Sequence, residues 1–90
     1  MLLGVTRIED FDRFWKTYTT KGAAKRKQHG SKGSTVFHDP EHPDRVLVVF
    51  DWDMDGWEKF MSDPEVPGIF AEAGVKGPPK VAQIADTHTA

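Results

Sequence analysis

The segment RVLVVFDWDMDGWEKF, residues 45–60, places a run of bulky apolar residues directly before the start of an amphipathic helix. Residues 46–50 are apolar at every position. This is typical of a strand covered on both faces, because a strand with one solvated face alternates apolar and polar residues. We therefore expect this strand to lie in the middle of a sheet, with a layer of protein on each side of it.

The length and composition limit the fold to one small domain, residues 1–90. A chain of this size buries a modest fraction of its surface, so an uncovered apolar face gains stability by pairing with a second subunit. The formal net charge of -2 argues against a general nucleic-acid binder. The chain has no cysteine, no apolar run long enough to cross a membrane and no signal-peptide pattern at its start. We expect a cytoplasmic protein.

Two strands and a long helix are predicted before the central strand. The first strand covers residues 2–8, and Asp10 is placed to cap a helix by accepting a hydrogen bond from the amide of residue 12 or 13. Residues 19–22 weaken this helix, which resumes over residues 23–28. Four aromatic side chains share one face of its first part: Phe11, Phe14, Trp15 and Tyr18.

The second predicted strand, residues 33–39, joins the central strand through the loop DPEHPD, which is short enough for an antiparallel hairpin. After the central strand, Asp53 or Asp55 caps a helix that buries Trp57, Phe60 and Met61. Prolines at 64 and 67 break this helix, a further helical segment spans residues 65–73, and the last strand covers residues 81–86.

The element order is strand, helix, strand, strand, helix in two pieces, strand, which is the split βαβ pattern of ferredoxin-like folds. We expect an α+β fold with a four-stranded antiparallel sheet and helices on one face. The other face would be bare in a monomer, although the central strand is apolar on both sides. A second copy of the sheet is the simplest cover, so we expect a homodimer.

Four segments, in this order, carry a resemblance to a known family: EDFDRFW (9–15), VFHDPEHPDRVLVVFDWD (36–53), WEKFMSDPEV (57–66) and AGVKGPPKV (73–81). From about Val5 to Ala85 the chain resembles the antibiotic biosynthesis monooxygenase-like branch of the dimeric α/β-barrel superfamily. The resemblance implies a homodimeric α/β barrel in which two sheets pack face to face. It also implies a small-molecule pocket between each sheet and its own helices. Such relatives include cofactor-independent monooxygenases of polyketide quinones, haem-degrading enzymes and polyketide cyclases.

The catalytic groups of several relatives are missing at the matching positions. A Tyr and a His form an acid/base pair in the plant polyketide cyclases of the superfamily, and Phe60 and Val66 stand there in this chain. The iron-ligating His of haem-degrading members is matched by Phe70, and the Trp that distorts haem falls near Asp51 or Trp52. We therefore expect no cofactor.

Three side chains are candidates for proton transfer: His38, Asp51 and Tyr18. His38 ends a predicted strand, which can direct its side chain at a cavity, and histidine is a common proton-transfer residue. Asp51 interrupts the apolar run; a buried carboxylate there would need a partner or a raised pKa, but a solvated acid at the strand end is the favoured interpretation. The hydroxyl of Tyr18 can bind a ligand or reach solvent from the aromatic helix face.

Six aromatic residues are candidates to line a flat pocket, although most aromatic side chains of a small domain are ordinary core: Trp15, Phe37, Trp52, Trp57, Phe60 and Phe70. The histidines and acids of residues 38–44 have metal-ligand chemistry, but no helix makes them converge, so we expect a solvated turn and no metal site. The cations around the end of the first helix complement its dipole rather than bind an anion: Lys21, Lys25, Arg26, Lys27 and Lys32.

Two classes of function fit these features. The first is a cofactor-independent monooxygenase or cyclase that acts on a small aromatic or polyketide-like compound, in a pocket that excludes water. The alternative is a non-catalytic module that binds a ligand or another protein. The residues alone name neither a substrate nor a biological partner.

Overall fold

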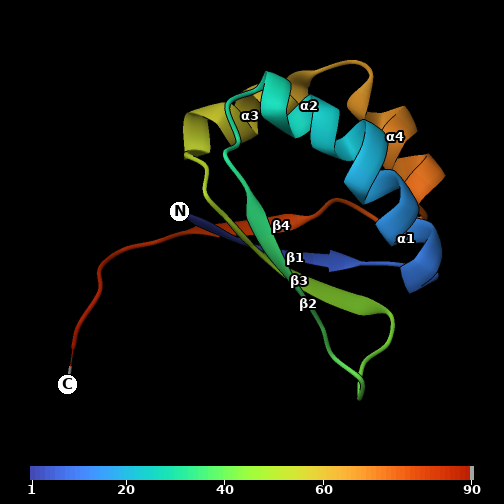
Figure 1. Ribbon diagram of the computed structural model, residues 1–90, viewed down its shortest axis with the longest axis horizontal. Coiled ribbons are helices and arrows are strands. Elements are labelled where there is room, and N and C mark those ends of the chain that lie inside the picture. The colour runs from blue at the N-terminus through green and yellow to red at the C-terminus, as the bar shows by residue number, and fades with distance from the viewer. Residues whose placement is uncertain (90) are drawn as a thin grey trace.

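A computed structural model describes residues 1–89. Four antiparallel strands form one sheet, in the order β2-β3-β1-β4: β1 (Leu2–Arg7), β2 (Ser34–His38), β3 (Arg45–Phe50) and β4 (Lys80–Gln83). The helical elements are α1 (Phe11–Thr17), the π-helical η1 (Tyr18–Gly22), α2 (Ala23–Gln28), α3 (Met54–Ser62) and α4 (Val66–Ala73). All of them lie over one face of the sheet (Figure 1). The predicted α+β, ferredoxin-like arrangement is confirmed.

The pairing of strands confirms the central position of β3. It pairs with β2 on one side, as the predicted hairpin, and with β1 on the other. The last strand is shorter than the predicted 81–86, because Gln83 pairs with Leu2 at the start of β1 and the partner strand ends there. None of the helices within residues 1–89 is long and apolar enough to span a bilayer.

The two faces of the sheet differ in how they are covered. On β3, Val46, Val48 and Phe50 are buried under the helices, whereas Leu47 and Val49 point to the opposite face and are half-buried. That outer face also carries the exposed side chains of Leu3 and Phe37, 42% and 54% accessible. No layer of helices covers this outer face, which is the lower side of the sheet in Figure 1. A single subunit therefore leaves apolar surface in contact with water.

The orientation of α1 differs from the predicted one. Asp10 caps the helix as expected, with its carboxylate 2.8 Å from the amide nitrogen of Arg13. The buried residues of α1 are Phe14 and Thr17, while Trp15, predicted to line a pocket with the other aromatic residues, is 44% exposed. The cause is its packing: the indole stacks beside Phe11 and Tyr18, with ring centroids 5.8 Å from each, so it covers their rings and not the sheet.

A charged cluster attaches α2 to the turn between α3 and α4. Asp63 accepts hydrogen bonds from Lys25 Nζ and His29 Nε2, each at 2.9 Å, and its second oxygen accepts one from the amide of Glu65. The hydrogen bond from His29, with the further donors, holds the pKa of Asp63 well below its usual range. This cluster fixes α2 over the sheet, and with it the side chains that α2 directs inward.

Gly56 in α3 lies where no larger residue fits. A Cβ atom there would come 2.6 Å from the carbonyl oxygen of His29 and overlap Trp52 Nε1, which donates to that same oxygen. Asp53, one of the two predicted caps, accepts from the Gly56 amide at 2.7 Å and so begins the helix at this point. The close approach therefore joins the start of α3 to the end of α2.

We expect Gly56→Ala to destabilise the fold by about 1–3 kcal/mol, because overpacking outweighs the better helix propensity of alanine. The matched control is Gly68→Ala in α4, where a Cβ would meet nothing within 4 Å. That change should stabilise by roughly 0.4–1 kcal/mol. Urea denaturation of both variants measures the difference. If both substitutions changed the free energy of unfolding equally and in the same direction, the close packing inferred at Gly56 would be contradicted.

Candidate ligand-binding site

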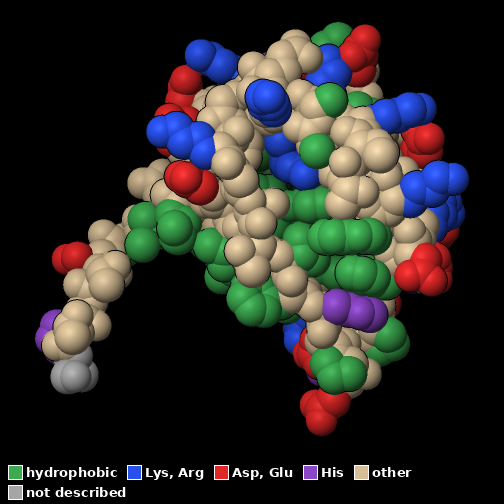
Figure 2. Space-filling model, in the orientation of Figure 1, with side chains coloured by type: hydrophobic (Ala, Val, Ile, Leu, Met, Phe, Trp, Pro, Cys, Tyr) green, Lys and Arg blue, Asp and Glu red, His purple; other side chains and the backbone are tan. Residues whose placement is uncertain are grey.

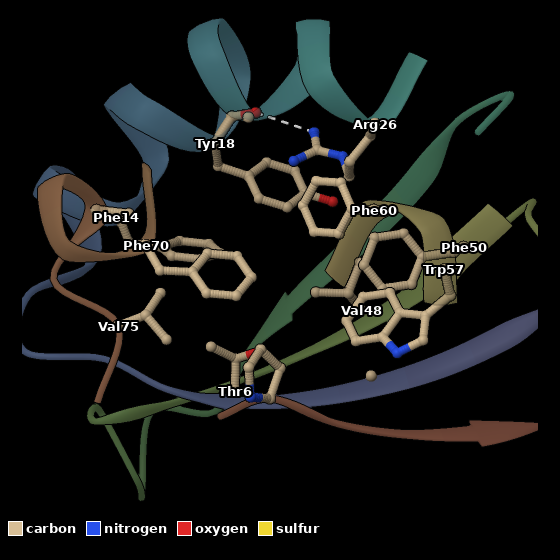
Figure 3. A pocket seen from close by; sticks show the side chains of 14 residues that line it. Thr6, Phe14, Tyr18, Arg26, Val48, Phe50, Trp57, Phe60, Phe70 and Val75 are labelled. Atoms are coloured by element: carbon tan, nitrogen blue, oxygen red, sulfur yellow. Dashed lines mark hydrogen bonds between the residues drawn. The ribbon is translucent and has the colours of Figure 1, made fainter. Parts of the chain in front are cut away.

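A cavity lies between the inner face of the sheet and the helical layer (Figure 3). It offers about 50 Å³ to water-sized molecules, within about 560 Å³ of empty space that includes its open mouth. Hydrophobic side chains gather in the hollow beneath the helices (Figure 2). Six aromatic residues line the cavity: Phe14, Tyr18, Phe50, Trp57, Phe60 and Phe70.

The floor of the cavity comes from the two central strands. Gly4 and Thr6 of β1 and Val48 of β3 face the helices, as the alternation of strand side chains requires. Gly4 carries no side chain at the point where the ring of Phe50 crosses β1; a Cβ there would lie 3.0 Å from that ring. The absence of a side chain at this position leaves room for the aromatic wall.

Three polar side chains reach this apolar cavity: Thr6, Tyr18 and Arg26. The ring of Tyr18 lines it, and the hydroxyl shares a 2.5 Å hydrogen bond with Ser34 Oγ on β2. Within residues 1–89, no carboxylate and no imidazole is part of the lining. The cavity therefore contains aromatic surface and a cation, but no strong base.

Arg26 lies over the ring of Tyr18, with its guanidinium carbon 3.6 Å from the ring centroid (Figure 3). Nη2 donates a 2.9 Å hydrogen bond to the backbone oxygen of Tyr18. Burial lowers the pKa of Arg26, and its interaction with Tyr18 opposes that shift. Arginine still carries its charge at neutral pH, so the cavity has a permanent positive group at its helical side.

The π-helical turn places Arg26 above Tyr18. Two turns of an α-helix take about 7.2 residues, so the residue seven positions later would normally share a side with Tyr18. A π-helical turn contains roughly one additional residue. The residue eight positions later, Arg26, therefore takes that place. Gly22 clears the path between them, since a Cβ there would lie 3.0 Å from Arg26 Nη1.

The structure brings four of the predicted site residues together and leaves the others apart. Tyr18, Trp57, Phe60 and Phe70 line the cavity. Trp52 is buried behind them and donates to the carbonyl oxygen of His29 at 2.9 Å. The two remaining aromatic candidates, Trp15 and Phe37, are exposed outside the lining.

The other two candidates for proton transfer lie outside the cavity. His38 is exposed at the end of β2, where its ring stacks on Phe11 at 4.5 Å and Nε2 lies 3.1 Å from the carbonyl oxygen of Pro43. Asp51 follows β3 and is exposed, in agreement with the solvated position favoured from the sequence. Neither side chain can reach a molecule inside the cavity without a rearrangement.

The loop after β2 is an internally bonded turn. Asp39 accepts from the Glu41 amide at 2.9 Å and from Arg45 Nη2 at 3.1 Å, and the backbone bond is the main cause of its lowered pKa. Asp44 pairs with Arg7. In the described part of the chain, no three His, Cys, Asp or Glu side chains converge to hold a metal ion.

Arg26 is a charged residue of the cavity lining that sequence analysis missed. Its sequence neighbours are lysines, and the sequence predicts that all five cations form a solvated surface near a helix end. Lys21 does pair with an acid at the surface, Glu72, whereas Lys25 pairs with the largely buried Asp63. Arg26 alone of the five lines the cavity. The one signal in the sequence was the weakened stretch TTKG before it.

Comparisons with known proteins identify the fold. No family model matches the sequence, and no curated protein matches it. SnoaB, a cofactor-independent oxygenase from Streptomyces nogalater, is structurally similar with a TM-score of 0.71 at 12% identity, over 96% of this chain and 92% of that one.

Two further structures agree with this result. A proposed antibiotic biosynthesis monooxygenase from Bordetella bronchiseptica has a TM-score of 0.71 at 16% identity, over 97% of both chains. A second one, from Deinococcus radiodurans, has a TM-score of 0.66 at 13% identity, over 100% of this chain and 98% of that one. The resemblance inferred from the sequence is thus confirmed at the level of the fold: the chain has the ferredoxin-like fold of the antibiotic biosynthesis monooxygenase structures.

Proposed function

We propose that this protein binds a small aromatic molecule in the cavity between its sheet and helices. The observation that supports this best is the lining: six aromatic side chains surround a space that no side chain fills. Ligand pockets are typically apolar, with a few polar groups that fix the orientation of the ligand. Thr6, Tyr18 and Arg26 are suited to that role.

The proposed working form is a cytoplasmic homodimer. The outer face of the sheet exposes Leu3 and Phe37 beside the half-buried Leu47 and Val49. Face-to-face packing of two such sheets would cover these side chains and form an α/β barrel. Each subunit would keep its own cavity on the opposite side of its sheet.

A change of Thr6 to Phe is expected to fill the cavity and abolish binding of 4-nitroanisole, a neutral aromatic probe. Thr6 lies on the cavity floor (Figure 3). Thr87→Phe is the matched control, since it adds the same ring at an exposed position outside the lining. Two-dimensional NMR titration should show the largest shifts at the Trp57 indole in the wild type and in the control. A wild type without saturable shifts would refute the proposed binding.

A cofactor-independent monooxygenase is the second, more specific candidate, favoured by the structural likeness to SnoaB. In such a reaction the substrate supplies the electrons: 1-naphthol and one molecule of oxygen give 1,4-naphthoquinone and water. We expect oxygen uptake with 1-naphthol that Thr6→Phe removes. Binding without oxygen uptake would instead support the non-catalytic alternative.

A further inference from the structure

We propose that Arg26 makes the cavity selective for small aromatic molecules that carry a negatively charged oxygen, a phenolate or a carboxylate. The inference rests on the proposed function, that the cavity binds an aromatic molecule, and adds the charge of that molecule. It concerns one residue of the helical layer.

The first support is the missing counter-charge. Among the ion pairs of residues 1–89, none involves Arg26, whereas Lys21, Lys25 and Arg13 each pair with an acid. A cation removed from water costs free energy unless a partner compensates it. Stacking on Tyr18 and one carbonyl bond supply part of that compensation. An anionic ligand would supply the rest.

The second support is the number of free donors. A guanidinium has five N–H groups, and Nη2 of Arg26 uses one of them for the Tyr18 carbonyl. The one side-chain nitrogen of the described residues that is wholly buried without a partner belongs to Arg45. Nε and Nη1 of Arg26 are therefore not wholly buried, and the side chain is part of the cavity lining. Their planar arrangement fits two oxygens of a carboxylate or one phenolate oxygen.

The third support is the surface around the same residue. Arg26 also lines a second, more open hollow on the α2 and β2 side, together with Lys27 and Lys32. No acid is part of the lining of this hollow within the described residues. Three cations around one depression attract an anion before it reaches the apolar interior.

The described lining of the cavity also contains no strong base that could remove a proton from a ligand. Tyr18 is the one other titratable side chain in the described lining, and its hydroxyl is engaged with Ser34. A ligand that is already ionised at neutral pH avoids the need for a base. Arg26 would then hold the negative oxygen while the aromatic walls enclose the ring.

The test uses 4-nitrophenol, whose ionised and neutral forms have different visible spectra. Binding to the wild type is expected to lower the apparent pKa of the probe, because Arg26 stabilises the phenolate. Arg26→Gln should remove this shift and weaken nitrophenolate binding about tenfold or more, the change expected for one charge-assisted hydrogen bond. Arg26→Lys, which keeps the charge, should retain part of the shift.

Two controls separate this proposal from the binding proposal. Lys27→Gln removes a charge from the outer hollow but not from the cavity, so the apparent pKa of bound nitrophenol should change little. 4-Nitroanisole cannot ionise, so Arg26→Gln should weaken its binding far less than that of nitrophenolate. Saturable binding of 4-nitroanisole to the wild type, with no lowering of the apparent pKa of bound nitrophenol, would overturn the role of Arg26 alone. Failure of both probes to bind the wild type would overturn both proposals.

A comparison of 4-nitrobenzoate with its methyl ester distinguishes the two forms of negative oxygen. Preference for the acid over the ester, lost in Arg26→Gln, assigns the site to carboxylates. A lowered apparent pKa of nitrophenol, without a preference for the acid over the ester, assigns the site to phenolates. No dependence on Arg26 in either series would contradict the proposal.

Discussion

A Val49→Asp variant is expected to be monomeric at concentrations at which the wild type is a dimer. Val49 lies on the outer face of the central strand, opposite Leu3 on β1 and Thr35 on β2. In the proposed dimer this position is covered by the second sheet, so the variant would bury an unpaired carboxylate. That costs several kcal/mol, or about a hundredfold or more in the dissociation constant. Sedimentation equilibrium across a range of protein concentrations measures it.

The control for this experiment is Ala24→Asp, which adds the same charge at an exposed position of α2, in the helical layer on the other face of the sheet. It should leave the dimer intact. A wild type that remains a stable folded monomer at micromolar concentration would refute the dimer. Such a result would leave the cavity proposal standing, because the lining comes from a single subunit.

Phe60→Ala should have the second large effect, a loss of about 3–5 kcal/mol in the free energy of unfolding. Phe60 is 3% exposed and lies in an aromatic cluster, with its ring centroid 5.3 Å from Trp52, 5.8 Å from Trp57 and 5.9 Å from Phe70. Truncation removes ring contacts on three sides and enlarges a space that is already incompletely filled. Urea denaturation at one fixed protein concentration is the measurement, since the proposed dimerisation would make stability depend on concentration.

The matched control is Lys59→Ala, one position earlier on the same helix. Lys59 is exposed and pairs with Asp55 at 3.1 Å, an ion pair of the kind that contributes roughly 0.3–0.5 kcal/mol. A similar loss in both variants would mean that the aromatic cluster does not determine the effect, since alanine has the highest helix propensity and cannot itself weaken α3. A loss below about 1 kcal/mol at Phe60 would show that the cluster repacks around the missing ring.

The elements of the fold were predictable because local signals agreed with the tertiary structure. The apolar run of β3, and the caps at Asp10 and Asp53, depend on neighbours in the sequence and appear where expected. The predicted end of the last strand was wrong, because the length of this strand depends on how far β1 extends beside it. Pairing length is a property of two strands, and the sequence of one strand does not contain it.

The site was less predictable, for a related reason. Helical spacing correctly grouped Trp57 and Phe60, which lie on a regular α-helix. The same spacing failed for Trp15, because aromatic stacking along α1 left its indole outside the core. Arg26 was missed for another reason: it was grouped with four lysines at a solvated helix end, and its inward direction depends on a turn that is not α-helical. Whether His38 or Asp51 has a role in catalysis stays a prediction; both side chains lie outside the cavity.

The π-helical turn makes the charge of the cavity depend on helix geometry as well as on residue identity. Closing the turn between Tyr18 and Gly22 into a regular α-helix, with the number of residues unchanged, would rotate every later position of α2 by about 100°, the angle of one helical residue. The aromatic walls on α3 and α4 would keep their places, but the guanidinium would leave the ring of Tyr18 and point elsewhere. Deleting one residue of the turn at the same time would place Arg26 seven positions after Tyr18, again on the side that faces the ring, so the length and the geometry of this turn together determine whether the cavity contains a cation.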